Sequence, residues 1–133
     1  MRKFIAALAF STLALGGIAA VAAKEKQTGA EKLAEMLDGR EAGKPQACIT
    51  TTRGSELQVI DKTALVYKDG DTLWVNRTAH PDDLDSSDVL VIQRTDGMQL
   101  CKLDQVTAVD QTAGFFKNVV FLQDFVPYKK PAG

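Results

Sequence analysis

The sequence is poor in the residues that form metal and catalytic sites. Its 133 residues include one histidine and two cysteines, and no serine stands in a nucleophile-elbow motif. One histidine and two cysteines that pair with each other cannot supply the four ligands of a tetrahedral zinc site. We therefore expect no metal ion and no cofactor, and we expect that the protein is not an enzyme.

The sequence also lacks an excess of charge of either sign. It carries 16 Lys and Arg residues against 17 Asp and Glu residues, which gives a formal net charge of -1. Contacts with phosphates require a basic surface, so we do not expect nucleic acid as a partner. What is present is 45% apolar and 25% charged residues, the usual composition of one globular domain.

The first 23 residues have the layout of a secretory signal peptide. Arg2 and Lys3 form a short basic start, an apolar stretch follows, and alanines precede the next charge at Lys24. Cleavage after Ala22 and cleavage after Ala23 are both compatible with the pattern. The alternative is an uncleaved membrane anchor, because the apolar run approaches the roughly 20 residues that span a bilayer. Glycines and hydroxyl residues interrupt the run and favour the signal peptide.

Removal of residues 1–23 leaves 110 residues with 14 basic and 17 acidic side chains. We expect them to form one domain over residues 24–128, without a membrane span, and a loose tail at 129–133. Export places the domain in the periplasm or outside the cell, where thiols are oxidised. Cys48 and Cys101 are therefore expected to form a disulfide. Closing a loop of roughly 50 residues contributes about 4 kcal/mol to the free energy of unfolding in the chain-entropy model.

A short amphipathic helix is expected near the start of this domain. Thr28 and Glu31 match the capping box, in which each side chain accepts a hydrogen bond from the backbone N–H of the other residue. The helix then begins at Gly29, and Gly39 suits its C-terminal end. The apolar residues that fall on one helical face are Ala30, Leu33, Ala34 and Leu37.

A first β-hairpin is predicted around Asp69-Gly70, because Asp-Gly favours the positive φ angles of a two-residue hairpin loop. Its strands are expected at 63–68 and 71–76. This register places Leu65 opposite Trp74 and puts apolar side chains on both faces. The hairpin is therefore expected to be buried on more than one side.

A second hairpin is predicted around Asp96-Gly97, with strands at 89–95 and 98–103. The same register rule places Ile92 opposite Cys101. Cys101 then points inward, and its disulfide ties the start of the β region to its middle.

The remaining β-branched stretches complete a mainly β (α+β) fold. They supply further strand candidates at 48–52, 57–60, 106–110, 119–122 and 125–126. We expect six or seven short, largely antiparallel strands. These strands form a small barrel or a strongly bent sheet, and the amino-terminal helix covers one opening or face.

The loop between the two hairpins holds the only histidine. His80 with Asp82 or Asp83 would suit a small hydrolase-like enzyme as general base and orienting acid, with Ser55 or Ser86 as the nucleophile. The spacing carries no specificity. Such a run is more often a solvated loop in which proline and aspartates form turns.

The same loop offers a weak calcium site as a further alternative. Hard cations bind several oxygen ligands, and the loop contains the carboxylates of Asp82, Asp83, Asp85 and Asp88. The run lacks the central glycine and closing glutamate of a helix-loop-helix calcium site. A calcium-responsive module is therefore a lesser hypothesis.

Phe115 and Phe116 are the residues most readily assigned to binding a partner. They follow Gly114 in an expected loop at 111–117, and two adjacent side chains on an extended backbone cannot both face the same core. One of them is thus expected to be an exposed anchor for another protein. The alternative is that a domain with few large apolar residues needs both inside.

Several segments between residues 32 and 128 form a recognisable set. They are Ala42-Gly43-Lys44-Pro45, Cys48-Ile49, Ile60-Asp61-Lys62-Thr63-Ala64, Val66-Tyr67, Val75-Asn76-Arg77, Gln99-Leu100-Cys101 and Asp124-Phe125-Val126-Pro127-Tyr128. Together they resemble a family of small exported proteins of unknown function from alphaproteobacteria. The resemblance implies export and a paired cysteine, and it assigns no activity and no site residue. We therefore expect a non-catalytic, periplasmic or secreted module that binds another envelope or secreted protein, in an oligomeric state that the sequence leaves open.

Overall fold

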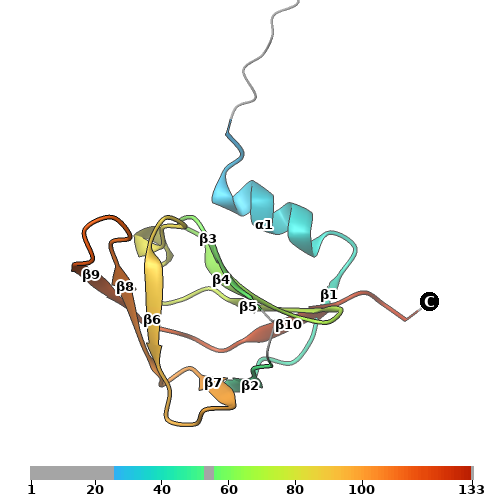
Figure 1. Ribbon diagram of the computed structural model, residues 1–133. Coiled ribbons are helices and arrows are strands. Elements are labelled where there is room, and N and C mark those ends of the chain that lie inside the picture. The colour runs from blue at the N-terminus through green and yellow to red at the C-terminus, as the bar shows by residue number, and fades with distance from the viewer. Residues whose placement is uncertain (1–25, 53–55, 133) are drawn as a thin grey trace, which may run out of the picture.

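The computed structural model describes residues 26–52 and 56–132. In these residues the chain forms one α-helix and ten strands in three sheets (Figure 1). The mainly β fold with an amino-terminal helix is confirmed. It takes the form of bent sheets, and across the described residues they do not close into a barrel. The predicted signal peptide at 1–23 and Ser55 lie outside the described residues.

The largest sheet has five antiparallel strands in the order β1-β10-β5-β4-β3. They are β1 (Glu41–Ala42), β3 (Leu57–Ile60), β4 (Ala64–Asp69), β5 (Thr72–Asn76) and β10 (Val126–Lys129). Short elements such as the two-residue β1 raise the number of strands above the six or seven predicted. The sequence predicts a loose tail from residue 129, but Lys129 still pairs with Glu41.

The helix α1 (Gly29–Leu37) begins at the residue that the capping box predicts. The Thr28 Oγ1 atom accepts a hydrogen bond from the Glu31 N–H at 3.2 Å, and a Glu31 carboxylate oxygen accepts one from the Thr28 N–H at 3.3 Å. Leu33 is buried against one face of the five-stranded sheet. The buried residues in its cluster are Ile60, Ala64, Val66, Leu73 and Val75. In the described part of the chain, no helix is long and apolar enough to cross a membrane.

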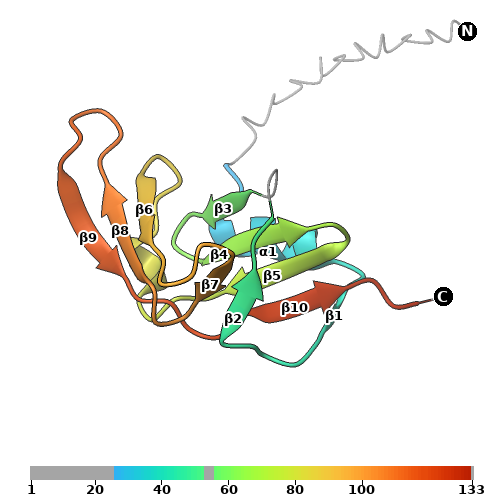
Figure 2. The same ribbon diagram turned by 60° about the horizontal axis from the view of Figure 1, so that its bottom comes forward.

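Two smaller sheets lie on the other side of the five-stranded sheet. One consists of β6 (Val89–Gln93), β8 (Gln105–Val109) and β9 (Phe116–Val120), in the order β6-β8-β9. The other pairs β2 (Cys48–Thr50) with β7 (Gln99–Cys101). Figure 2 shows the three-stranded sheet to one side of the five-stranded sheet, with β6 as its strand nearest to β3. A second buried cluster, which includes Ile49, Leu65, Leu100, Val106 and Phe125, joins all three sheets.

The hairpin of β4 and β5 forms as predicted, but its loop is displaced by one residue, so that each residue of β4 has a partner two residues further along β5. Leu65 lies opposite Asn76 rather than Trp74, because the two loop residues are Gly70 and Asp71. Gly70 has a φ of 55°, and Asp71 is not among the residues with positive φ. A loop that needs a positive φ only at its first central position places glycine there.

The second predicted hairpin does not form. β6 pairs with β8, and β7 pairs with β2, so that Cys101 lies opposite Cys48 and not opposite Ile92. The backbone of the predicted second strand bonds to β2 instead: the Thr51 N–H donates to the Met98 carbonyl at 2.9 Å, and the Lys102 N–H donates to the Ala47 carbonyl at 2.8 Å. The buried carboxylate of Asp104 accepts hydrogen bonds from the backbone N–H of Cys101 at 2.8 Å and of Thr95 at 3.3 Å, and so holds the segment in this arrangement.

Candidate functional site

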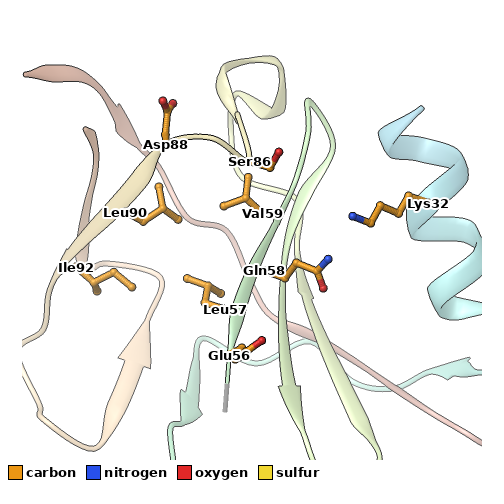
Figure 3. Close-up of a pocket in the computed structure, with 9 residues that line it drawn as sticks. All are labelled: Lys32, Glu56, Leu57, Gln58, Val59, Ser86, Asp88, Leu90 and Ile92. Carbon is orange, nitrogen blue, oxygen red and sulfur yellow. The ribbon is translucent and has the colours of Figure 1, made fainter. Parts of the chain in front are cut away.

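A groove lies between β3 and β6, which are edge strands of two different sheets (Figure 3). Its volume is about 440 Å³. Its lining residues are Lys32, Glu56, Leu57, Gln58, Val59, Ser86, Asp88, Leu90 and Ile92. Figure 3 shows the four apolar side chains directed into the space between the two strands, while Gln58 is directed toward Lys32 on α1. The groove thus combines an apolar floor with charged side chains, Lys32, Glu56 and Asp88, at its borders.

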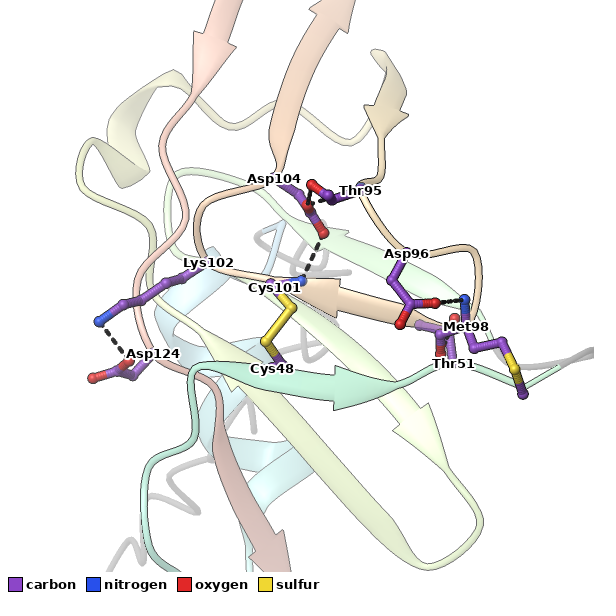
Figure 4. Close-up of a disulfide and its surroundings, with 9 residues drawn as sticks. All are labelled: Cys48, Thr51, Thr95, Asp96, Met98, Cys101, Lys102, Asp104 and Asp124. Atoms are coloured by element: carbon purple, nitrogen blue, oxygen red, sulfur yellow. Dashed lines mark hydrogen bonds and ion pairs between the residues drawn. A yellow bond between two sulfur atoms is a disulfide. The ribbon is translucent and has the colours of Figure 1, made fainter.

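The predicted disulfide between Cys48 and Cys101 is present (Figure 4). The two residues are direct neighbours across the β2–β7 pair and are half-buried. The next pair along, Ile49 and Leu100, is buried in the cluster that joins the three sheets. The two cysteine sulfurs of the chain are bonded to each other, so neither is available as a nucleophile or metal ligand. The disulfide fixes two short strands to the core.

His80 is exposed and immediately precedes the short 3-10 helix η1 (Pro81–Asp83). Its ring meets the ring of Phe121 edge-on, with the centroids 6.3 Å apart. Ser86 is engaged elsewhere, because its hydroxyl donates to a carboxylate oxygen of Asp61 at 3.0 Å. Among the described residues, no hydrogen bond joins the His80 ring to a carboxylate or a hydroxyl. The structure thus does not assemble the described parts of the predicted hydrolase-like site.

The carboxylates of the loop that follows are held by the protein itself. Asp85 accepts hydrogen bonds from the Ser87 hydroxyl at 2.7 Å and from the Ser87 N–H at 2.9 Å, and these bonds lower the pKa of Asp85. Asp88 pairs with Lys117 at 2.8 Å, and this contact raises the pKa of Lys117. In the described residues no three potential ligands are grouped for a metal ion. The four aspartates therefore do not converge on one point.

Phe115 and Phe116 are both exposed, with exposed fractions of 58% and 61%. The sequence predicts a loop here, but β9 begins at Phe116, which lies opposite Val109. Phe121 follows the end of the same strand and is also 58% exposed. Three large aromatic side chains thus meet solvent on or beside one strand.

The register of β6, β8 and β9 places these side chains on one face of their sheet. Val89 is opposite Val109, and Val109 is opposite Phe116, so the three form a row across the strands. The alternate residues of β8 and β9, such as Val106 and Val120, are buried on the inner face. The apolar residues of the outer face, which we name the aromatic face, are Val89, Val91, Val109, Phe116, Val119 and Phe121, with Phe115 at the border. The polar side chains of Gln93, Gln105 and Thr107 lie among them on the same side of the sheet.

Asn76 fixes the segment that continues from the aromatic face. This fully buried side chain at the end of β5 donates from Nδ2 to the Gln123 carbonyl at 2.7 Å. Its Oδ1 atom accepts from the Gln123 N–H at 2.9 Å and from the Thr78 N–H at 3.1 Å. The segment is thereby held with Leu122 buried and Phe121 outward.

Comparisons of the chain with protein-family models, with curated proteins and with solved structures find no match. The predicted resemblance to an exported family stays a prediction. Functional assignment therefore depends on the geometry of the aromatic face and of the groove. The sequence analysis identified Phe115 and Phe116 but not the groove. For the rest of the aromatic face, the signal in the sequence is the unbroken apolar run at 89–92, which puts apolar side chains on both faces of one strand.

Proposed function

We propose that this protein is a non-catalytic, exported module that binds another protein through the aromatic face. The observation that carries the proposal is the row of half-exposed apolar side chains across β6, β8 and β9. Single exposed apolar residues are ordinary on protein surfaces, but a group of neighbouring exposed apolar and aromatic side chains is typical of an interaction site. Phe116 at the start of β9 and Phe121 directly after its end are both more than half exposed, and they supply the anchors.

Export is the part of this proposal that depends on the cysteines and the first residues. A disulfide between Cys48 and Cys101 fits an oxidising compartment, where such bonds persist. The predicted signal peptide at 1–23 and the resemblance to an exported family point to the same compartment. We therefore propose the periplasm or the cell exterior as the location, and an envelope or secreted protein as the partner.

The test compares capture of a partner by variants of the full, tagged chain from an envelope fraction. Phe116→Ser and Phe121→Ser are expected to reduce partner recovery at least about tenfold, because anchor residues carry most of the binding free energy. Leu103→Ser is the matched control, since Leu103 is 90% exposed and lies outside the aromatic face. It is expected to leave recovery unchanged.

The melting temperature decides between an anchor and a core residue. Serine at position 116 is expected to leave it nearly unchanged, because the Phe116 side chain is exposed. A large loss of stability, or equal recovery with all three variants, would contradict the proposed function.

A further inference from the structure

We infer that the groove between β3 and β6 binds an extended segment of a partner protein as an additional β-strand. Within residues 26–52 and 56–132, β3 ends the five-stranded sheet and β6 ends the three-stranded sheet, so each has a single paired neighbour there. The backbone groups on the other side of each strand are left for a further strand. Both free edges border the same groove (Figure 3). This site uses the inner side of β6 and is separate from the aromatic face.

The hydrogen bonds of β3 show which backbone groups face the groove. The Lys68 N–H donates to the Glu56 carbonyl at 3.3 Å across the β3–β4 pair. In an antiparallel pair the bonding residues alternate along each strand, so Gln58 also bonds toward β4. The N–H and C=O groups of Leu57 and Val59 consequently point away from β4 and toward the groove.

The same alternation applies to β6. The Asp110 N–H donates to the Phe115 carbonyl at 2.9 Å, which shows that even-numbered residues of β8 bond toward β9. The extra residue in the β8–β9 pair is on β9, so the alternation along β8 is unbroken. Thr107 then bonds toward β6. The partner of Thr107 on β6 is Val91. Its neighbours Leu90 and Ile92 therefore direct their backbone groups away from β8 and toward the groove.

The side chains in the groove define the chemistry of the segment that fits. Leu57, Val59, Leu90 and Ile92 are half-buried against the core, so apolar side chains at alternate positions of the segment would extend that cluster. The positions between them would face Lys32. The groove is also lined by Asp88, which pairs with Lys117, and by Glu56 at the start of the β3 side. Within the described residues Lys32 has no ion-pair partner, so an acidic residue at the position nearest Lys32 complements it.

A free extended segment fits this groove better than a second folded copy of the chain. An edge strand of a second copy comes attached to its own sheet. The opposite wall of the groove would obstruct that sheet. A single strand needs less room, because it requires only the usual distance between two neighbouring strands on the side where it forms hydrogen bonds. The occupant is therefore a segment of a partner that is extended before or upon binding.

The test uses amide hydrogen exchange of the full chain, followed by NMR. In the free protein, the amides of Leu57, Val59, Leu90 and Ile92 are expected to exchange at least about tenfold faster than that of Gln58, which is bonded within the sheet. The probe is an eight-residue peptide that alternates valine with threonine and carries one aspartate at a central threonine position. At millimolar concentration it is expected to slow exchange of the four amides at least about tenfold.

Backbone methylation of the probe provides a control that leaves the protein unchanged. Peptides N-methylated at the valines or at the threonines lose one hydrogen-bonding edge, and at least one of them is expected to bind about tenfold more weakly. Lys32→Glu, at an exposed residue, is expected to weaken the aspartate peptide and to favour a version with lysine instead.

Three results would overturn the inference. The first is slow exchange of the four amides in the free protein. The second is that both methylated peptides bind as tightly as the unmethylated peptide. The third is that neither the aspartate peptide nor the lysine peptide slows the exchange of the four amides. Val91→Thr and Phe116→Ser change the aromatic face only and are expected to leave peptide binding as it is. Loss of peptide binding in either variant would likewise contradict a separate groove site, and failure of partner capture alone would concern only the proposed function.

Discussion

Lys117 shows how single side chains hold the loop between β5 and β6. Its Nζ atom lies 2.8 Å from one carboxylate oxygen of Asp88, whose side chain is only 3% exposed, and 3.9 Å from Asp85. One cation on β9 thus holds two carboxylates of the loop. The loop also bonds to the turn between β3 and β4, through Leu84 and Ser86, and the ion pair of Lys117 joins it to the three-stranded sheet.

The contribution of Lys117 to the stability of the fold is expected to be lost at alkaline pH. The pKa of Lys117 lies above its ordinary value of 10.5, chiefly because of its hydrogen bond with Asp88. A raised pKa in the folded state means that the contribution is complete below pH 10.5 and is lost as the pH rises through the raised pKa. The difference in melting temperature between the wild type and Lys117→Met should therefore be constant at neutral pH and shrink in strong alkali.

A second lysine supplies the control for this experiment. Lys102 pairs with Asp124 at 3.2 Å, but both side chains are nearly half exposed. Exposed ion pairs contribute little, so Lys102→Met should lower the melting temperature less than Lys117→Met. Equal effects of the two substitutions, or a Lys117→Met difference that persists in strong alkali, would show that the pair with Asp88 is not the cause.

At the scale of single elements, the sequence predicts what local interactions determine. The start of α1 depends on Thr28 and Glu31, which are three residues apart, and the prediction is confirmed. The β4–β5 hairpin is also local, and only the position of Gly70 in its loop was wrong. The prediction of the second hairpin was wrong because residues 99–101 pair with β2, a strand from far earlier in the chain that the local Asp96-Gly97 signal does not reveal.

Gly29 allows α1 to pack close to the turn between β3 and β4, an effect that helix propensity does not describe. A Cβ atom at position 29 would collide with the carbonyl oxygen of Asp61 and the hydroxyl of Thr63. Alanine is the better helix former by about 1 kcal/mol. Gly29→Ala is nevertheless expected to lower the free energy of unfolding, because the first turn must move away from the sheet. Chemical denaturation measures the change.

Gly97 is a matched position for the same substitution. A Cβ atom there has nothing within 4 Å, and its φ lies outside the left-handed region. Gly97→Ala should be neutral or stabilise the protein by up to about 1 kcal/mol, through a less flexible unfolded chain. If Gly29→Ala stabilises the protein as much as Gly97→Ala does, the close approach of α1 to Asp61 is not essential.

For the whole molecule, the layout of the sheets was beyond the reach of the sequence. The fold class and the pairing of Cys48 with Cys101 were predicted, because composition and export suggest both. The groove was not, because the sequence paired β6 with the wrong strand and gave no partner order for β3. Phe115 and Phe116 were identified because they are adjacent in the sequence. Val89 and Phe121 were missed, because they join the aromatic face only through the pairing of β6, β8 and β9. Which edges remain free depends on contacts between distant segments.

The disulfide is expected to stabilise the molecule as a whole. β2 and β7 pair only with each other, and they carry Ile49 and Leu100 into the shared core. The double variant Cys48→Ser, Cys101→Ser should lower the free energy of unfolding by about 4 kcal/mol, as expected for closure of a long loop. Urea denaturation of the variant and of the reduced wild type should agree. A loss below about 1 kcal/mol in both would show that packing alone holds the small sheet.

The place of β10 in the five-stranded sheet determines when the edge of β5 is covered. β1 and β5 are joined only through β10, so a chain that has been synthesised as far as residue 125 lacks the strand that connects them. β3, β4 and β5 are able to pair with one another at that stage, but β5 still has a free edge. A free strand edge is a template for pairing with another chain, so the incomplete chain is expected to aggregate more readily than the complete one.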